Sequence, residues 1–119
     1  MQRAMAERLR TADYRPEKIF TSPFLRAQQT AQILGDVLGC PVIDLDALGE
    51  PFDAEAVLAA VGDGTTLLVG HVPTMPQMVN LLVGEAALGG MEKSSAAVVT
   101  FDGKPAFGAG TLVDYLIPE

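Results

Sequence analysis

The strand-to-helix junction at residues 18–38 decides the fold of this chain; it reads KIFTSPFLRAQQTAQILGDVL. Lys18–Thr21 is a short strand candidate. Ser22 followed by Pro23 is typical of a helix start, with serine as the N-cap and proline in the first turn. Gly39 is expected to end this helix. Apolar residues at a spacing of three to four predict its buried face: Phe24, Ala27, Ala31, Leu34 and Leu38.

Strand and helix patterns alternate along the rest of the chain. Beyond the junction and a first helix at 3–10, we expect a strand at 41–44, a helix at 54–61, a buried strand at 66–70, a helix beginning near 73 and a closing hairpin of strands 96–101 and 111–117. This order predicts an α/β three-layer sandwich with a mixed, mainly parallel sheet and a C-terminal antiparallel hairpin. The length of 119 residues and an apolar content of 49% predict a single domain over residues 1–119.

The charge of the chain is uneven. The net charge is −7, but six of the eight basic residues lie within the first thirty positions, and only Lys93 and Lys104 are basic after them. Such an acidic body repels a polyphosphate backbone, so we expect no nucleic acid partner. Any anion site should lie in the N-terminal third of the chain.

Membrane and metal signals are missing from the sequence. No apolar run approaches the roughly 18 residues that a membrane span needs, and no secretory leader precedes the first helix pattern, so we expect no membrane partner and a cytoplasmic location. The single cysteine, Cys40, cannot form an internal disulfide, which agrees with that location. No cluster of cysteine and histidine could hold zinc, and we expect neither a metal nor a cofactor. The oligomeric state is left open.

Two strand-to-helix junctions bring polar side chains to the expected carboxyl ends of strands. In the first, Arg26 lies four residues after Ser22. Helical side chains lean toward the helix N-terminus, so its guanidinium can reach the end of the preceding strand and bind phosphate through two hydrogen bonds. In the second, His71 directly follows a buried strand and Gly70, where open α/β sheets bind ligands. The residues alone favour an ordinary surface arginine at position 26 and leave a structural and a functional histidine open at position 71.

The segment Ser22–Thr30, SPFLRAQQT, followed further along by Leu68–His71, LVGH, resembles the histidine phosphatase superfamily (phosphoglycerate-mutase-like). The small size and Pro73 make the chain most similar to its short SixA-type phosphohistidine phosphatases. The resemblance implies a phosphohydrolase that acts on a phosphorylated protein or a small phosphoester, through a phosphohistidine intermediate formed on an N-terminal Arg-His-Gly triplet. It also implies that Arg26 and His71 bind the phosphoryl oxygens and stabilise the transition state, and that Ser22 adds a hydroxyl or backbone contact.

The Arg-His-Gly triplet does not occur in this sequence, which holds a single histidine. We therefore expect an N-terminally incomplete domain that lacks its central strand and its nucleophile and is inactive as it stands. In the family this strand lies between the strand ending at His71 and the strand Ala96–Phe101. Without it we expect an apolar slot lined by Leu67–Val69 and Val98–Val99, closed by an upstream segment, by direct pairing of the two strands or by a strand of a neighbouring chain. The alternative function is a phosphate- or phosphohistidine-binding pseudophosphatase without catalysis.

Two carboxylates between the motifs, Glu50 and Asp53, are candidates for the acid that protonates the leaving group. A phosphoimidazole leaves more readily than an alcohol, so this branch of the family needs little help from an acid. Roles as loop and helix-cap carboxylates explain both residues better.

Other phosphatase chemistries fit the sequence less well. Asp44 followed by Asp46 resembles the start of Mg²⁺-dependent aspartyl phosphatases, but Leu48 stands where that family has threonine or valine. A cysteine phosphatase needs arginine six residues after Cys40, and Asp46 occupies that position, so Cys40 is expected to be a small core residue. The glycine pairs near 89 and 108 lack the lysine of a nucleotide loop and indicate turns.

Overall fold

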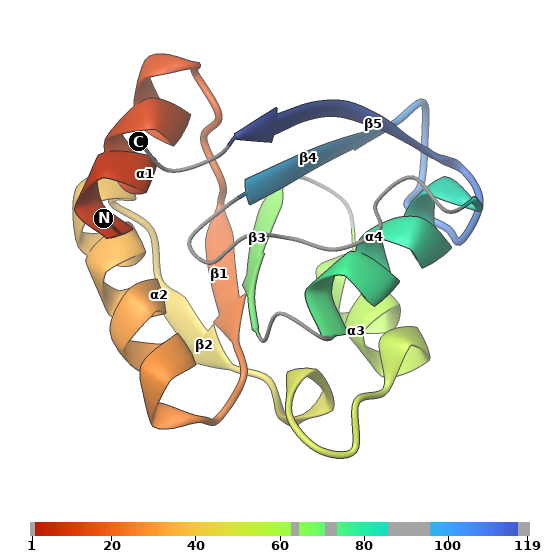
Figure 1. Ribbon diagram of the computed structural model, residues 1–119, viewed down its shortest axis with the longest axis horizontal. Helices are drawn as coiled ribbons and strands as arrows, with labels where there is room; N and C mark the ends of the chain where they lie inside the picture. The colour runs from red at the N-terminus through yellow and green to blue at the C-terminus, as the bar shows by residue number, and fades with distance from the viewer. Residues whose placement is uncertain (1, 63–64, 71–73, 86–95, 117–119) are drawn as a thin grey trace.

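The computed structural model describes residues 2–62, 65–70, 74–85 and 96–116, and Figure 1 shows their arrangement. The helices and strands of this part are α1 (Gln2–Thr11), β1 (Lys18–Thr21), α2 (Leu25–Leu38), β2 (Val42–Asp44), the 3₁₀ turn η1 (Asp46–Leu48), α3 (Ala54–Val61), β3 (Thr66–Val69), α4 (Thr74–Val83), β4 (Ala96–Phe101) and β5 (Gly110–Leu116). The predicted alternation of strands and helices is confirmed.

The three N-terminal strands form a parallel sheet in the order β2-β1-β3. β1 lies in the middle, with Thr21 opposite Asp44 on β2 and opposite Val69 on β3. α2 connects β1 to β2, and α3 connects β2 to β3, as parallel neighbours require. The carboxyl ends of all three strands therefore lie at one edge of the sheet, which we call the carboxyl edge.

The sheet separates two apolar clusters. Ile19 belongs to the first cluster, with side chains of α1, α2 and β3, whereas Phe20 belongs to the second, with Leu48, Val57 of α3 and Met78 of α4. Successive side chains of a strand point to opposite faces, so adjacent residues of β1 enter different clusters. Figure 1 shows the result, with α1 and α2 on one side of the sheet and α3 and α4 on the other. This is the predicted three-layer arrangement.

The C-terminal strands β4 and β5 form the predicted antiparallel hairpin, with a bulge between Val98 and Val99. The hairpin is a two-stranded sheet of its own. Among the residues that the structure describes, β3 pairs only with β1 and β4 pairs only with β5. Direct pairing of β3 with β4, one of the three expected ways to close the slot, is therefore not observed there.

Helix ends follow local signals in part. Gly39 ends α2 in the left-handed conformation, with φ of 71°, as predicted, and its N–H donates to the Gly35 carbonyl at 2.8 Å.

The longest helix of the described residues, α2, has 14 residues. None of the described helices is long and apolar enough to cross a bilayer.

Candidate active site

The carboxyl end of β1 is held from both sides by backbone hydrogen bonds. Leu45 N–H donates to the Thr21 carbonyl at 2.8 Å, and Ser22 N–H donates to the Val69 carbonyl at 3.0 Å. Ser22 therefore extends the pairing with β3 by one residue. These bonds fix the backbone from which the chain enters α2.

Thr21 and Ser22 are fully buried at this edge, although both are polar. Thr21 Oγ1 donates to the Ser22 carbonyl at 3.0 Å, as expected for a buried hydroxyl, which rarely lacks a partner. Two buried polar residues at the end of an apolar strand mark a place where the fold accepts polar groups.

The start of α2 differs from the prediction. Ser22 was expected to cap the helix with Pro23 in its first turn, but the N-cap is Phe24 and the helix begins at Leu25. The first helical bond runs from Gln28 N–H to the Phe24 carbonyl at 3.0 Å. The reason is that Ser22 is still paired with β3, so the chain turns into the helix only after Pro23. The prediction that Phe24 is buried is also wrong, since its exposed fraction is 42%.

The later start leaves the first turn of α2 without a side-chain cap and without an acidic residue. The backbone N–H groups of such a turn carry partial positive charge and favour an anion. Arg26 lies in this turn, is exposed, and has no hydrogen bond or ion pair among the described residues. The junction therefore offers a guanidinium and the positive end of a helix beside the buried end of β1.

His71 lies outside the described residues, and its expected approach to Arg26 remains a prediction. The structure places the strand that leads to it: Val69 is opposite Thr21, and the two strands run in parallel. The chain therefore leaves β3 at the carboxyl edge from which it also leaves β1. Gly70 is close to α4, because a Cβ there would lie 3.2 Å from Met75 Sδ.

The two candidate acids differ in their surroundings. Asp53 is the N-cap of α3, and its carboxylate accepts a hydrogen bond from Ala56 N–H at 3.2 Å. Glu50 is exposed and follows Gly49, which is buried against Pro23: a Cβ at Gly49 would lie 2.9 Å from Pro23 Cδ. The backbone before Glu50 thus touches the start of the phosphatase-like motif. No local pattern predicts this contact, because residues 23 and 49 are distant along the chain.

The residues of the rival chemistries have structural partners. Asp44, at the carboxyl end of β2, accepts a hydrogen bond from Gln28 Nε2 at 3.2 Å. Cys40 packs against the first apolar cluster, and burial raises the pKa of its thiol, which disfavours the reactive thiolate. Among the described residues, no three histidine, cysteine or carboxylate side chains lie together as a metal site would require.

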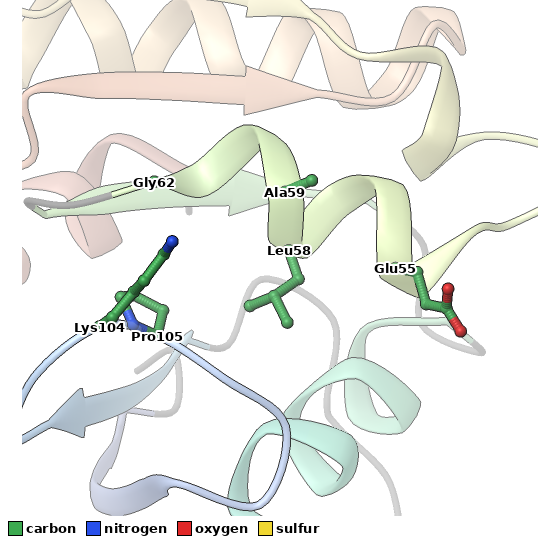
Figure 2. Close-up of a pocket in the computed structure, with 6 residues that line it drawn as sticks. All are labelled: Glu55, Leu58, Ala59, Gly62, Lys104 and Pro105. Atoms are coloured by element: carbon green, nitrogen blue, oxygen red, sulfur yellow. The ribbon is translucent and has the colours of Figure 1, made fainter.

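A cavity of about 360 Å³ lies elsewhere, between α3 and the loop that joins β4 to β5. Figure 2 shows Lys104 and Pro105 of this loop on the side of α3 toward which Leu58 extends, with Glu55 at the far end of the helix. None of the candidate site residues lines this cavity. Its lining holds one cationic and one carboxylate side chain and no other polar side chain, so the cavity does not indicate a particular ligand or reaction.

Comparison with known proteins agrees with this architecture. The sequence profile of the histidine phosphatase superfamily (branch 1) matches residues 1–52. A solved structure of the protein histidine phosphatase SixA complexed with tungstate is 30% identical in sequence, with a TM-score of 0.81. The match covers 97% of this chain and 77% of that chain. The chain belongs to the histidine phosphatase superfamily.

Two further structures are similar. A protein from Agrobacterium tumefaciens assigned as phosphohistidine phosphatase SixA is 25% identical, with a TM-score of 0.80 over 98% of this chain and 80% of that chain. A protein from Nakamurella multipartitia with the same assignment is 22% identical, with a TM-score of 0.78 over 98% and 79%, and at this identity it supports the fold alone. No curated protein sequence matches the chain.

Proposed function

We propose that this domain is a phosphohydrolase of the histidine phosphatase type, which takes phosphate from phosphohistidine on a protein or from a small phosphoester. The observation that supports it most directly is the position of Arg26, exposed and without a described partner in the uncapped first turn of α2. The similarity to a protein histidine phosphatase solved in complex with tungstate, an oxyanion, supports anion binding by this domain.

Phosphate binding rests on the groups at the carboxyl edge. The Arg26 guanidinium makes charge-assisted hydrogen bonds to two phosphoryl oxygens, and the N–H groups of the first turn of α2 add partial positive charge. Ser22 contributes a hydroxyl or backbone contact, and His71 binds a further oxygen as charge spreads over them in the transition state.

The nucleophile in this proposal is the histidine of an Arg-His-Gly segment outside these 119 residues, because the one histidine of the sequence is His71. Its imidazole nitrogen forms a bond to phosphorus while the bond to the leaving group breaks, and the leaving group takes up a proton. Water then attacks the phosphoenzyme, releases inorganic phosphate and restores the free histidine.

The strand that would bring this histidine would lie between β3 and β4. The outer edge of β3 and one edge of β4 have no strand partner among the described residues. Thr66 Oγ1 on β3 is buried and has no hydrogen-bond partner in the same part of the chain, which is uncommon for a buried hydroxyl. A strand between β3 and β4 would pair both open edges.

Glu50 is the better placed of the two candidate acids in this proposal. The carboxylate of Asp53 is engaged with the N-terminus of α3. Glu50 is exposed and follows the residue that touches Pro23. Glu50 would protonate an alkoxide leaving group, whereas a phosphohistidine substrate would need it less.

Oxyanion titration of an arginine pair tests the proposal. Arg26→Ala should weaken tungstate or inorganic phosphate binding by roughly 10- to 100-fold, since a hydrogen bond to a charged group contributes about 1.5–3 kcal/mol. Arg10→Ala is the matched control, because Arg10 is also an exposed helical arginine but pairs with Glu7 on α1. Calorimetry of both variants measures the difference. Equal affinity of the wild type and Arg26→Ala would refute the site.

A pseudophosphatase is the second candidate, because the sequence contains only one histidine. Phosphohistidine hydrolysis by the 119-residue chain should not exceed that of Arg26→Ala, whereas a version with an upstream Arg-His-Gly segment should be active without added metal. The nucleotide sequence before the Met1 codon separates the two: an in-frame triplet favours the enzyme and a stop codon favours the binding module. Turnover by the 119-residue chain that EDTA abolishes would favour Asp44 and Mg²⁺ instead.

A further inference from the structure

The segment Leu45–Gly49 lies against the carboxyl edge of the sheet. It is attached to β1 by the hydrogen bond from Leu45 N–H to the Thr21 carbonyl at 2.8 Å. Leu48 is fully buried in the second apolar cluster, and Gly49 N–H closes the turn on the Asp46 carbonyl at 2.9 Å. A backbone bond, a core anchor and a closed turn therefore hold Gly49 in one position.

Gly49 lies against the proline ring that precedes α2. A Cβ there would be 2.9 Å from Pro23 Cδ and 3.1 Å from Pro23 Cγ, with the Asp46 carbonyl oxygen at 3.3 Å. Gly49 has φ of −93° and ψ of −136°, so its φ lies outside the left-handed region that favours glycine. The close approach of the Pro23 ring leaves little room for a side chain at this position.

Neither side of this contact can move easily. The pyrrolidine ring of Pro23 is rigid, and the preceding Ser22 is bonded to the Val69 carbonyl. On the other side, Leu48 anchors the turn in the core. A side chain at position 49 would therefore push on the short connection between β1 and α2, three residues before Arg26.

We propose that Gly49 is a positioning residue for the phosphate site: its missing side chain lets the turn at 45–49 set the place of Pro23, and through it the direction in which Arg26 leaves the first turn of α2. This inference rests on the proposed phosphate site. Binding geometry is sensitive to small displacements, and a misplacement of about 1 Å can reduce an active-site function by roughly 100-fold. Gly49 acts without touching the ligand.

Three variants test the proposal, each titrated with tungstate and each examined for the backbone amide resonances of Ser22, Leu25 and Arg26. Gly49→Ala should weaken tungstate binding by at least 5-fold and shift these three resonances. Gly103→Ala is the matched control, because a Cβ at Gly103 meets no atom within 4 Å, and it should bind as the wild type does. Pro23→Ala removes the ring carbons that Gly49→Ala would meet.

Relief of the contact separates positioning from general damage. In the Pro23→Ala background, adding Gly49→Ala should change tungstate affinity by less than 2-fold. The same loss in both backgrounds would overturn the proposal, as would unchanged affinity and resonances in Gly49→Ala. If Gly49→Ala alone does not fold, a folded double variant that binds like Pro23→Ala supports the contact, and an unfolded one beside a folded Pro23→Ala overturns it.

Arg26→Ala in the same titration distinguishes the phosphate site from the positioning role of Gly49. A loss of tungstate binding in Arg26→Ala together with wild-type binding in Gly49→Ala refutes the positioning role and leaves the phosphate site in place. Wild-type binding in Arg26→Ala refutes the phosphate site, and the positioning role fails with it.

Discussion

The carboxyl edge of the parallel sheet and the β4–β5 hairpin are held by contacts of different kinds. At the edge, backbone bonds reach β1 from both neighbours: Leu45 N–H to the Thr21 carbonyl and Ser22 N–H to the Val69 carbonyl. Two of these residues, Thr21 and Ser22, are fully buried. The carboxyl edge is therefore part of the buried core.

The hairpin is less buried than this edge: Leu116 is the only buried residue of β5, whereas Ile19, Phe20 and Thr21 of β1 are all buried. Gly108 N–H donates to the Leu81 carbonyl at the end of α4, and Tyr14 Oη donates to Asp114 Oδ2 at 3.3 Å. Leu116 reaches the first apolar cluster. Segments with fewer buried contacts open at lower free energy, so we expect the hairpin to be the less stable of the two regions. The proposed phosphate site lies in the region expected to be more stable.

Truncation of one side chain in each region should show the largest difference. Ile19→Ala removes a fully buried side chain of β1 and should lower the free energy of unfolding by about 2–5 kcal/mol. Val113→Ala truncates a side chain of β5 that is 51% exposed and should change it by less than about 0.5 kcal/mol. Urea denaturation followed by circular dichroism measures both. Similar losses of unfolding free energy in the two variants would contradict the expected difference between the two regions.

An intermediate effect is expected where the hairpin packs on α4. A Cβ at Gly110 would lie 2.5 Å from Val99 Cγ1 and 3.0 Å from the Leu82 carbonyl oxygen. Gly110→Ala must therefore displace β5 or α4 and should cost about 1–3 kcal/mol. Gly103→Ala, in the loop of the same hairpin, should be close to neutral. An unchanged stability of Gly110→Ala in thermal unfolding would mean that the hairpin can shift at no cost in free energy.

The smallest effect concerns the bond between Tyr14 and the hairpin. Partial burial and, after it, the negative charge of Asp114 raise the pKa of Tyr14 above its ordinary value of about 10. The folded protein then holds this proton more tightly than the unfolded chain does. The stabilisation is complete below pH of about 10 and is lost as the pH rises through the higher pKa of the folded state.

A titration of the Tyr14 ring by NMR checks the direction of this shift. Asp114→Asn should move the pKa of Tyr14 part of the way back, because the contribution of burial remains. Unfolding free energies at pH 9 and 11 should fall more in the wild type than in Tyr14→Phe. A pKa of Tyr14 that is unaffected by Asp114→Asn would show that the carboxylate does not tie the hairpin to this loop.

The class of fold was predictable because its signals are local. The alternation of strand and helix patterns, the glycine stop at Gly39 and the hairpin depend on residues that are neighbours in the chain. The motif Ser22–Thr30 indicated the family for the same reason, since it consists of nine consecutive residues. The approach of His71 to Arg26 stays a prediction.

The construction of the junction depends on contacts between segments that are distant in the chain. Ser22 does not cap α2, because its N–H is taken by the Val69 carbonyl on another strand, and Phe24 is exposed because the helix starts later. The contact of Gly49 with Pro23 likewise joins residues that no local pattern relates. Local propensity determined which elements form. The hydrogen bonds and close packing between distant segments determined where each element begins and which residues lie beside the proposed phosphate site, because these contacts exist only once the chain has folded.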